Sequence, residues 1–145
     1  MAAYSDRGLD QRDGRFDLAV GVGTDLESET QAIDWRSKCS IAACLDVLGD
    51  KWTLLIVRDL ISYETRTYSE FLGSPERIST NILADRLRLL TSLGVIERTN
   101  PAGAARNNAY RLTPSGRDLR PALEELGRWA QKHLKQYYPE MVESV

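Results

Sequence analysis

The chain has 145 residues, of which 42% are hydrophobic and 28% charged, and it carries a formal net charge of −2. This length and composition predict one globular domain with a core of its own. No apolar run in the sequence approaches the ~18 residues of a membrane-spanning helix, so none is expected. With two cysteines and one histidine, a four-ligand zinc site or a disulfide scaffold is excluded as well.

The N-terminal sequence lacks the apolar segment behind a basic start that marks a secretory signal. We therefore expect the protein in the cytoplasm, with no metal, no cofactor and no contact with a membrane. No Gly-rich phosphate loop and no nucleophile paired with the single histidine is present. The sequence therefore predicts that the protein is not an enzyme.

The charge is distributed unevenly. Residues 1–35 carry 3 arginines against 8 acidic residues, a net charge of −5, whereas residues 36–117 carry 12 basic against 8 acidic residues, a net charge of +4. Residues 118–145 carry 4 basic and 5 acidic residues, a net charge of −1. Local charge decides what a surface attracts, so the middle of the chain is suited to a polyanion although the whole chain is acidic.

We expect three parts. Residues 1–34 are rich in glycine and charge and poor in large apolar residues, which predicts a flexible acidic N-terminal extension. Residues 35–138 form the folded domain, and residues 139–145 are a C-terminal tail.

The first two predicted helices follow Trp35. Ile41, Leu45 and Leu48 recur at helical spacing before Gly49 ends the segment. Asp50 can cap a second helix, which has a broad apolar face. That face comprises Trp52, Leu55, Ile56, Leu60 and Ile61.

A short helix and a longer one come next. Thr67 with Glu70 three residues later forms a capping box for the short helix. Residues 73–75 form a turn, in which Pro75 suits the first position of a helical turn, and Ser79 can cap the longer helix. On a helical wheel of that helix, the apolar half comprises Ile82, Leu83, Leu87, Leu89, Leu90 and Leu93, and the other half comprises Thr80, Asn81, Ala84, Asp85 and Arg88. Arg86 falls inside the apolar half, which predicts an internal brace.

After Gly94 the period changes to that of strands. Residues 95–99 and 109–113 predict a hairpin with a long loop between them, and Thr113-Pro114 opens a last helix. Apolar residues on that helix step by four and three, which suits packing against another helix. This seam comprises Leu119, Leu123, Leu126, Ala130, His133 and Tyr137. We expect a mainly α (α+β) fold, a winged helix-turn-helix with a two-stranded β-wing and a long C-terminal dimerisation helix.

In a helix-turn-helix, the second helix lies in the major groove and its N-terminal residues contact base edges. Arginine and asparagine side chains have the donors and acceptors for that task, backbone amides at the start of the preceding helix can hold a phosphate, and a wing can contact the backbone or the minor groove. The candidate DNA-binding residues are therefore Arg66, Thr67, Tyr68, Arg77, Ser79, Thr80, Asn81, Ala84, Asp85, Arg88, Arg106 and Asn107. An exposed face of this kind also suits a second interpretation, a winged-helix docking module for proteins that makes no DNA contact.

Three motifs carry a family resemblance: LGDKWT at residues 48–53, RLR at 86–88 followed by LG at 93–94, and YRLTPSG at 110–116. Together with the sequence between residues 39 and 134, they make the chain similar to HxlR-type winged-helix regulators, relatives of the MarR group. The resemblance implies a homodimer, built from the first helices and the last helix, that binds a palindromic operator in double-stranded DNA. It also implies control of a neighbouring gene, often one for stress, quinone or aldehyde defence.

Cys39 matches the position that some HxlR-type regulators use as a thiol sensor. A cysteine at a helix start near Arg36 and Lys38 favours the thiolate, whereas Cys44 is interpreted as a small core residue. An apolar pocket for a small-molecule effector is the alternative sensor. Its candidate lining comprises Trp52, Trp129, Tyr137 and Tyr138.

Overall fold

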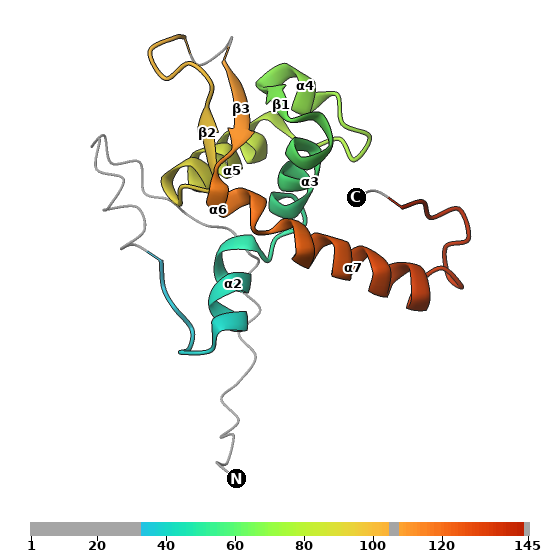
Figure 1. Ribbon diagram of the computed structural model, residues 1–145. Helices are drawn as coiled ribbons and strands as arrows, with labels where there is room; N and C mark the ends of the chain where they lie inside the picture. Colours follow the sequence, from blue (N-terminus) through green and yellow to red (C-terminus); the bar gives the residue numbers. More distant parts are fainter. Residues whose placement is uncertain (1–32, 105–107, 144–145) are drawn as a thin grey trace.

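The computed structural model describes residues 33–104 and 108–143, as Figure 1 shows. The predicted extension therefore lies outside the described residues except for Ile33 and Asp34. The helices are α2 (Ser40–Leu48), α3 (Thr53–Tyr63), α4 (Tyr68–Leu72), α5 (Thr80–Ser92), α6 (Pro114–Arg117) and α7 (Arg120–His133). The strands are β1 (Thr65–Thr67), β2 (Ile96–Arg98) and β3 (Ala109–Leu112).

The sheet has three strands in the order β1-β3-β2, and both pairings are antiparallel. The predicted hairpin is confirmed as β2 and β3, but the expectation of only two strands was incomplete because β1 pairs with the other edge of β3. This strand has three residues, too few for a detectable period, and its last residue is also the N-cap of α4. The sequence therefore indicated the start of a helix at Thr67 and gave no sign of the strand before it.

The core lies between α3, α4, α5 and the sheet. Its most deeply buried large side chains are Val57, Phe71, Leu83, Leu90 and Ile96. Burying one such side chain stabilises the fold by roughly 1.5–3 kcal/mol, so the leucine half of α5 anchors that helix and leaves its other half at the surface.

The end of β3 is tied back to the start of β2. The Thr113 backbone N–H donates to the Val95 carbonyl oxygen at 3.1 Å, and the Thr113 hydroxyl accepts from the Gly116 N–H at 3.2 Å. A Cβ at Gly116 would collide with that same Val95 carbonyl. The threonine and glycine of the YRLTPSG motif thus hold α6 against the sheet.

The last helix begins later than the sequence predicted. Thr113 caps α6 as expected, but the chain turns after Arg117 and α7 starts at Arg120. Pro121 explains the break, because it has no N–H for the helical ladder and its ring would clash with the carbonyl of Arg117. Tyr137 lies beyond the end of α7, so the predicted seam from Leu119 to Tyr137 does not run along one helix.

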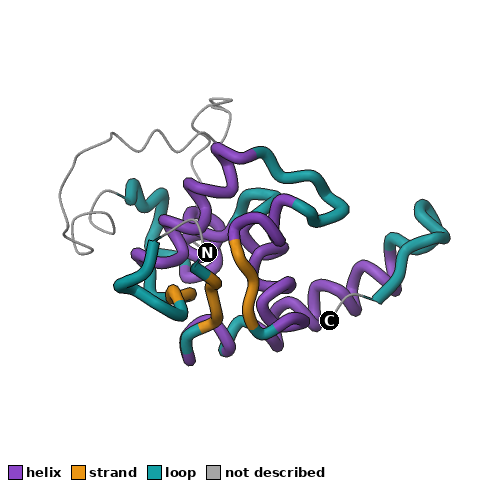
Figure 2. Tube along the Cα trace, turned by 90° about the horizontal axis from the view of Figure 1, so that it is seen from above, coloured by secondary structure: helices purple, strands orange, loops and turns teal. Residues whose placement is uncertain are grey.

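Helix α7 leaves the body of the molecule. Figures 1 and 2, which differ by a quarter turn, both show it as an arm that projects to one side. Helix α2 lies at the end of the molecule opposite the sheet (Figure 1). No helix among the described residues is long and apolar enough to cross a membrane.

Candidate nucleic-acid interface

Helices α4 and α5, joined by residues 73–79, form a helix-turn-helix unit. The capping box predicted for α4 is present: the Thr67 hydroxyl accepts from the Glu70 N–H, and the Glu70 carboxylate accepts from the Thr67 N–H. These hydrogen bonds hold the pKa of Glu70 below its ordinary value. The Tyr68 hydroxyl donates to the Thr80 carbonyl oxygen at 2.8 Å, which joins the first residues of the two helices.

The polar half of α5 is at the surface. Thr80, Asn81, Asp85 and Arg88 are exposed and Ala84 is half-buried. Arg88 lies 3.4 Å from Asp85 one turn earlier, with both side chains about half-exposed, and an exposed pair of this kind is weak and easily exchanged for another partner. This face thus presents the hydroxyl of Thr80 and the amide of Asn81 in the first turn of α5, and the carboxylate of Asp85 and the guanidinium of Arg88 one to two turns later.

The turn before α5 contributes two further exposed residues. Ser79 is the N-cap of α5, as predicted, but its side chain makes no capping hydrogen bond. Arg77 has a φ of 58°, a left-handed conformation that costs a non-glycine residue about 1–2 kcal/mol. Its N–H donates to the Ser74 carbonyl at 3.0 Å. Residues 74–77 therefore form a tight turn rather than the helical turn predicted at Pro75.

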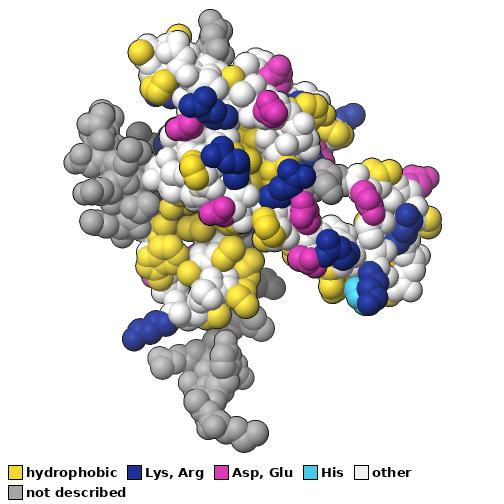
Figure 3. Space-filling view, in the orientation of Figure 1, with side chains coloured by type: hydrophobic (Ala, Val, Ile, Leu, Met, Phe, Trp, Pro, Cys, Tyr) yellow, Lys and Arg dark blue, Asp and Glu magenta, His cyan; other side chains and the backbone are white. Residues whose placement is uncertain are grey.

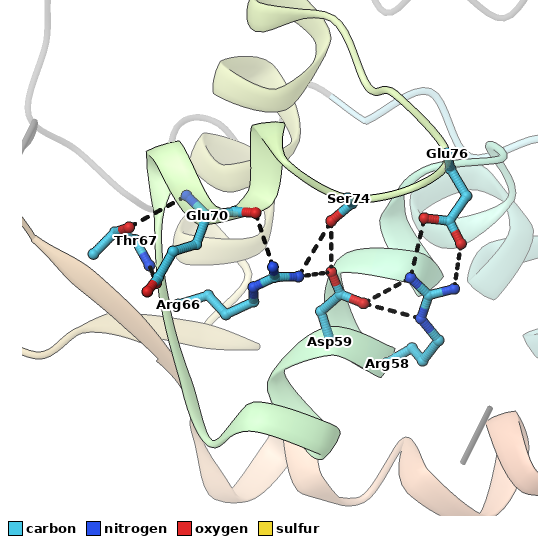
Figure 4. Close-up of polar contacts among 7 residues, drawn as sticks. All are labelled: Arg58, Asp59, Arg66, Thr67, Glu70, Ser74 and Glu76. Atoms are coloured by element: carbon cyan, nitrogen blue, oxygen red, sulfur yellow. Dashed lines mark hydrogen bonds and ion pairs between the residues drawn. The ribbon is translucent and has the colours of Figure 1, made fainter.

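A buried carboxylate holds the turn in place (Figure 4). Asp59 on α3 is 5% exposed. It accepts from the Nε and Nη2 atoms of Arg58 at 2.9 and 2.7 Å, from the Ser74 hydroxyl at 2.9 Å, and from Arg66. Arg58 also reaches Glu76 at 2.6 and 3.2 Å, and this contact raises the pKa of Arg58 and lowers that of Glu76.

The same network engages Arg66, which the sequence predicted as a phosphate contact. Besides Asp59, its guanidinium donates to the Glu70 carbonyl at 2.8 Å and the Ser74 hydroxyl at 3.2 Å. It also lies 4.6 Å from the ring centre of Tyr63. Since these partners occupy its donors inside the protein, Arg66 is placed as a brace of the helix-turn-helix and not toward a ligand.

Arg86 lies inward, as its position on the wheel predicted. Its side chain is 12% exposed, and its Nε lies 3.5 Å from a carboxylate oxygen of Asp50. The other role predicted for Asp50 is also present: it accepts from the N–H groups of Trp52 and Thr53 at 3.0 and 3.2 Å. The LGDKWT and RLR motifs therefore meet at one carboxylate, which links the start of α3 to α5.

The wing is described in part. Arg106 and Asn107 lie outside the described residues. Asn108 is buried, and its side chain accepts from the Asn100 N–H at 2.9 Å and donates to the Asn100 carbonyl. This side chain closes the base of the wing loop.

Two groups of functional residues were not predicted from the sequence. Asp59 and Arg58 stand inside the apolar run of α3, and a charged pair in such a run is the signal that could have identified the network. Asn108 had no comparable signal, because asparagine is common in any turn.

The first candidate sensor residue is at the surface. Cys39 is exposed at the N-cap of α2, and the backbone N–H groups of Ala42 and Ile41 lower the pKa of its thiol below the ordinary value. The interpretation of Cys44 as a core residue was wrong, because Cys44 is exposed as well. Only the C-terminal end of α2 reaches the core, where Leu48 is buried and Val47 packs against it, whereas Cys44 lies on the same exposed side as Ile41 and Leu45.

Helices α2 and α7 both carry apolar side chains that nothing among the described residues covers. Ile41 and Leu45 on α2 are 70% and 55% exposed, and Leu126 and Trp129 on α7 are 56% and 57% exposed. Figure 3 shows hydrophobic side chains gathered over α2. Exposed apolar side chains that gather in one patch mark interaction surfaces.

Comparison with known proteins agrees with this geometry. The model of the HxlR-like helix-turn-helix family matches residues 47–138. The uncharacterized HTH-type transcriptional regulator MT3179 of Mycobacterium tuberculosis (strain CDC 1551 / Oshkosh) is 34% identical over 98 residues, which are 66% of this chain and 59% of that protein. The chain thus spans about three fifths of the length of this relative.

Two solved structures show the same fold. PA1607, a candidate transcription factor, superimposes with a TM-score of 0.61 and 36% identity over 74% of this chain and 72% of its own. The reduced form of the transcriptional regulator YodB from B. subtilis superimposes with a TM-score of 0.55 and 26% identity over 67% of this chain and 95% of its own.

Proposed function

The chain belongs to the HxlR-like helix-turn-helix family of transcriptional regulators, and from that premise we propose that it binds a palindromic operator in double-stranded DNA as a homodimer. In this proposal α5 is the recognition helix and the chain works in the cytoplasm, where it meets DNA. The residues that contact DNA, the symmetry of the operator and the effector are the parts that we add to the family assignment.

The observation that carries the proposal is the division of α5 into two halves. Leu83, Leu87 and Leu90 are buried in the core, so the helix cannot rotate without losing several kcal/mol of burial. Asn81 and Arg88 are thereby kept on the outer face. An amide can form a bidentate contact with adenine and a guanidinium with guanine, and an acidic or apolar face would instead favour docking to a protein.

We assign contacts with the DNA backbone to the exposed residues around this helix. Ser79 and Thr80 carry hydroxyls at the N-terminus of α5, where the helix dipole favours a phosphate. Arg77 lies in the adjoining turn and adds a positive charge. Arg106 and Asn107 stay as proposed wing contacts, whereas we reassign Arg66 to bracing the unit.

Thr67 and Tyr68 also act mainly on the protein side. Thr67 is engaged in the capping box, and the Tyr68 hydroxyl donates to Thr80. The lone pairs of the Tyr68 oxygen can still accept a hydrogen bond, and the side chain is half-buried. In our proposal the main role of Tyr68 is to orient α5, and its minor role is to border the DNA.

The exposed apolar faces of α2 and α7 support the homodimer. A second copy of the chain that packs on Ile41, Leu45, Leu126 and Trp129 would cover them and remove their apolar area from water. A two-fold axis through this contact repeats α5 on the other side. Two recognition helices spaced by one turn of DNA, about 34 Å, bind half-sites of a palindrome.

We propose that a thiol-reactive compound acts on Cys39. The thiol is exposed and its pKa is lowered, and α2 belongs to the proposed dimer contact, so a modification there can change the spacing of the two recognition helices. The crystal structure of the quinone-bound YodB from B. subtilis, 26% identical to this chain, supports this type of effector. The alternative is a small molecule in an aromatic pocket, for which Trp129, Tyr137 and Tyr138 are exposed.

The proposal is tested by titrating the purified chain against its own upstream intergenic DNA and against random DNA of the same length. We expect tighter binding to the upstream DNA, with an affinity that falls steeply as salt rises because counterions are released from phosphates. Equal binding to both duplexes at every salt concentration would contradict sequence-specific recognition.

A further inference from the structure

A hollow of about 480 Å³ lies where the end of α3, strands β1 and β3 and the start of α7 meet. Its volume is within the range of about 300–1,000 Å³ that small-molecule sites occupy. Leu60, Ile61 and Leu112 supply an aliphatic part of the lining, and Leu60 and Leu112 are buried. Three arginines, Arg111, Arg117 and Arg120, line the same hollow.

Glu64 is the one acidic residue among the lining residues of the hollow. Arg111 donates its Nε to Glu97 and Arg120 donates its Nε to Glu124, both at 2.8 Å, and both carboxylates lie outside the lining. The Nη groups of Arg111 and Arg120 have no hydrogen-bond partner within residues 33–104 and 108–143. Donors therefore remain for a ligand.

The surface at the hollow combines positive and apolar side chains. Figure 3 shows Lys and Arg side chains around hydrophobic ones where β3, α6 and the start of α7 meet. A guanidinium binds a carboxylate through two parallel hydrogen bonds, and an aliphatic floor beside it favours a hydrocarbon group over water. A ligand that fits this lining therefore has a carboxylate for the arginines and a hydrocarbon group for the aliphatic side chains.

We propose that this arginine hollow binds a small organic carboxylate with an apolar body, and that its occupancy changes the affinity for DNA, the second part resting on the proposed function. The Nη groups of Arg111 and Arg120 hold the carboxylate, beside Arg117, whose Nη1 donates to the Leu112 carbonyl at 3.0 Å. Leu60, Ile61 and Leu112 hold the apolar body. The arginine hollow is distinct from Cys39 and from the candidate aromatic pocket at Trp129, Tyr137 and Tyr138. A carboxylate ligand and a thiol-reactive compound can therefore act on the chain independently.

The position of the hollow lets a bound ligand influence the helix-turn-helix. Glu64, on its rim, has a φ of 64° and a ψ of −47°, a strained conformation at the joint between α3 and β1. Strand β1 leads directly into α4, and Arg120 is the first residue of the α7 arm. A ligand that bridges this joint and α7 favours one relative position of the two. Where DNA binds that position with a different affinity from the others, the ligand changes the affinity for DNA, and DNA changes the affinity for the ligand by the same factor.

The binding test needs no DNA. Phenylacetate is titrated into the full chain and followed by amide chemical shifts, with phenylacetamide as its uncharged counterpart and inorganic phosphate as an anion without an apolar body. We expect phenylacetate to shift resonances of residues 60–65 and 111–120, and the two counterparts to bind at least tenfold more weakly. Equal binding of phenylacetamide or phosphate, or shifts confined to other residues, would overturn the ligand class or the site.

Paired variants locate the charge. Arg111→Gln combined with Arg120→Gln removes two of the three guanidiniums, and we expect at least a tenfold loss of phenylacetate affinity. Arg128→Gln is the matched control, because Arg128 is an exposed arginine on α7 that pairs with Glu125 outside the hollow, and it should bind as the unchanged chain does. Equal affinity of the double variant and the control would refute the arginine site.

The coupling to DNA is measured separately, as the affinity for upstream DNA with and without saturating phenylacetate. We expect a change of at least threefold that the double variant abolishes. Binding in the hollow with unchanged DNA affinity would overturn the regulatory part and keep the site. A chain that binds phenylacetate there but binds no DNA would refute the proposed function alone.

Discussion

The hydroxyl of Tyr68 donates a 2.8 Å hydrogen bond to the backbone carbonyl oxygen of Thr80. It joins the first residue of α4 to the first residue of α5, so one side chain sets the distance between the N-termini of the two helices. Both residues border the face that we assign to DNA. The orientation of the recognition helix therefore depends on an interaction that can be removed without disturbing the core.

Tyr68→Phe removes this hydrogen bond and keeps the ring. We expect a loss of about 1 kcal/mol in unfolding free energy and a several-fold weaker affinity for operator DNA, because α5 is oriented less firmly. Urea unfolding and fluorescence anisotropy measure the two effects. Tyr63→Phe is the control, since Tyr63 is exposed and lies outside the helix-turn-helix. The same loss of DNA affinity in both variants would contradict the role given to Tyr68.

Arg88→Ala tests base contact by α5. Arg88 is half-exposed and has only Asp85 nearby at 3.4 Å, so its removal should leave stability within a few tenths of a kcal/mol. Specific binding should weaken by about 1–3 kcal/mol, which is roughly 5- to 150-fold. Anisotropy titrations of operator and random DNA measure the difference, with Arg128→Ala on α7 as control.

An equal loss on random DNA would place Arg88 on the phosphates instead of the bases. Unchanged affinity for both duplexes would remove it from the interface altogether.

Glu76→Gln tests the clamp that holds the turn. Arg58 lowers the pKa of Glu76 below its ordinary value of 4.5, so the ionised form stabilises the folded chain. This contribution is complete above the ordinary pKa and is lost as the pH falls through the lowered one. We expect the variant to be less stable at pH 7, with a difference that disappears in stronger acid.

Urea unfolding at several pH values between 7 and 3 measures this difference. Glu140→Gln, in the exposed segment after α7, should unfold as the unchanged chain does. A difference between Glu76→Gln and the unchanged chain that persists undiminished at the lowest pH would contradict an electrostatic clamp.

Cys39→Ser tests thiol sensing. We expect unchanged affinity for operator DNA and loss of the release that diamide or a quinone causes in the unchanged chain. Because the pKa of the Cys39 thiol is lowered from its ordinary value of 9.0, its alkylation by iodoacetamide should reach half its maximal rate at a pH below 9.0. Cys44→Ser is a matched control, since Cys44 is exposed on the same helix. Release that persists in Cys39→Ser would end the thiol hypothesis.

The periodic parts of the fold could be predicted from the sequence. The periodic spacing of apolar residues predicts the leucine half of α5 and the strands β2 and β3. The Thr67–Glu70 capping box is recognised from a pattern of four consecutive residues. Arg86 was assigned inward because it interrupts an apolar face. In each case the residues that decide the outcome are close neighbours in the sequence, so a wheel or an alternation is sufficient.

The parts that depend on distant contacts could not be predicted. β1 exists because β3, more than 40 residues later, pairs with it. Arg66 points inward because Asp59 is buried seven residues earlier and Ser74 closes the turn eight residues later. Cys44 is exposed because only the C-terminal end of α2, at Leu48, packs into the core, and the apolar composition of the helix does not reveal this. The same apolar residues suit a helix that is buried in its own domain and a helix whose apolar face packs against another chain.

The central claim is that a homodimer places two copies of α5 on a palindrome. Hydroxyl-radical footprinting of the full chain on its own upstream intergenic DNA tests it most directly. We predict two protected segments related by a two-fold axis, with centres about 10 base pairs or a multiple of that apart, and loss of both in Arg88→Ala. A single segment without symmetry, or no protection beyond that seen on random DNA, would contradict the account.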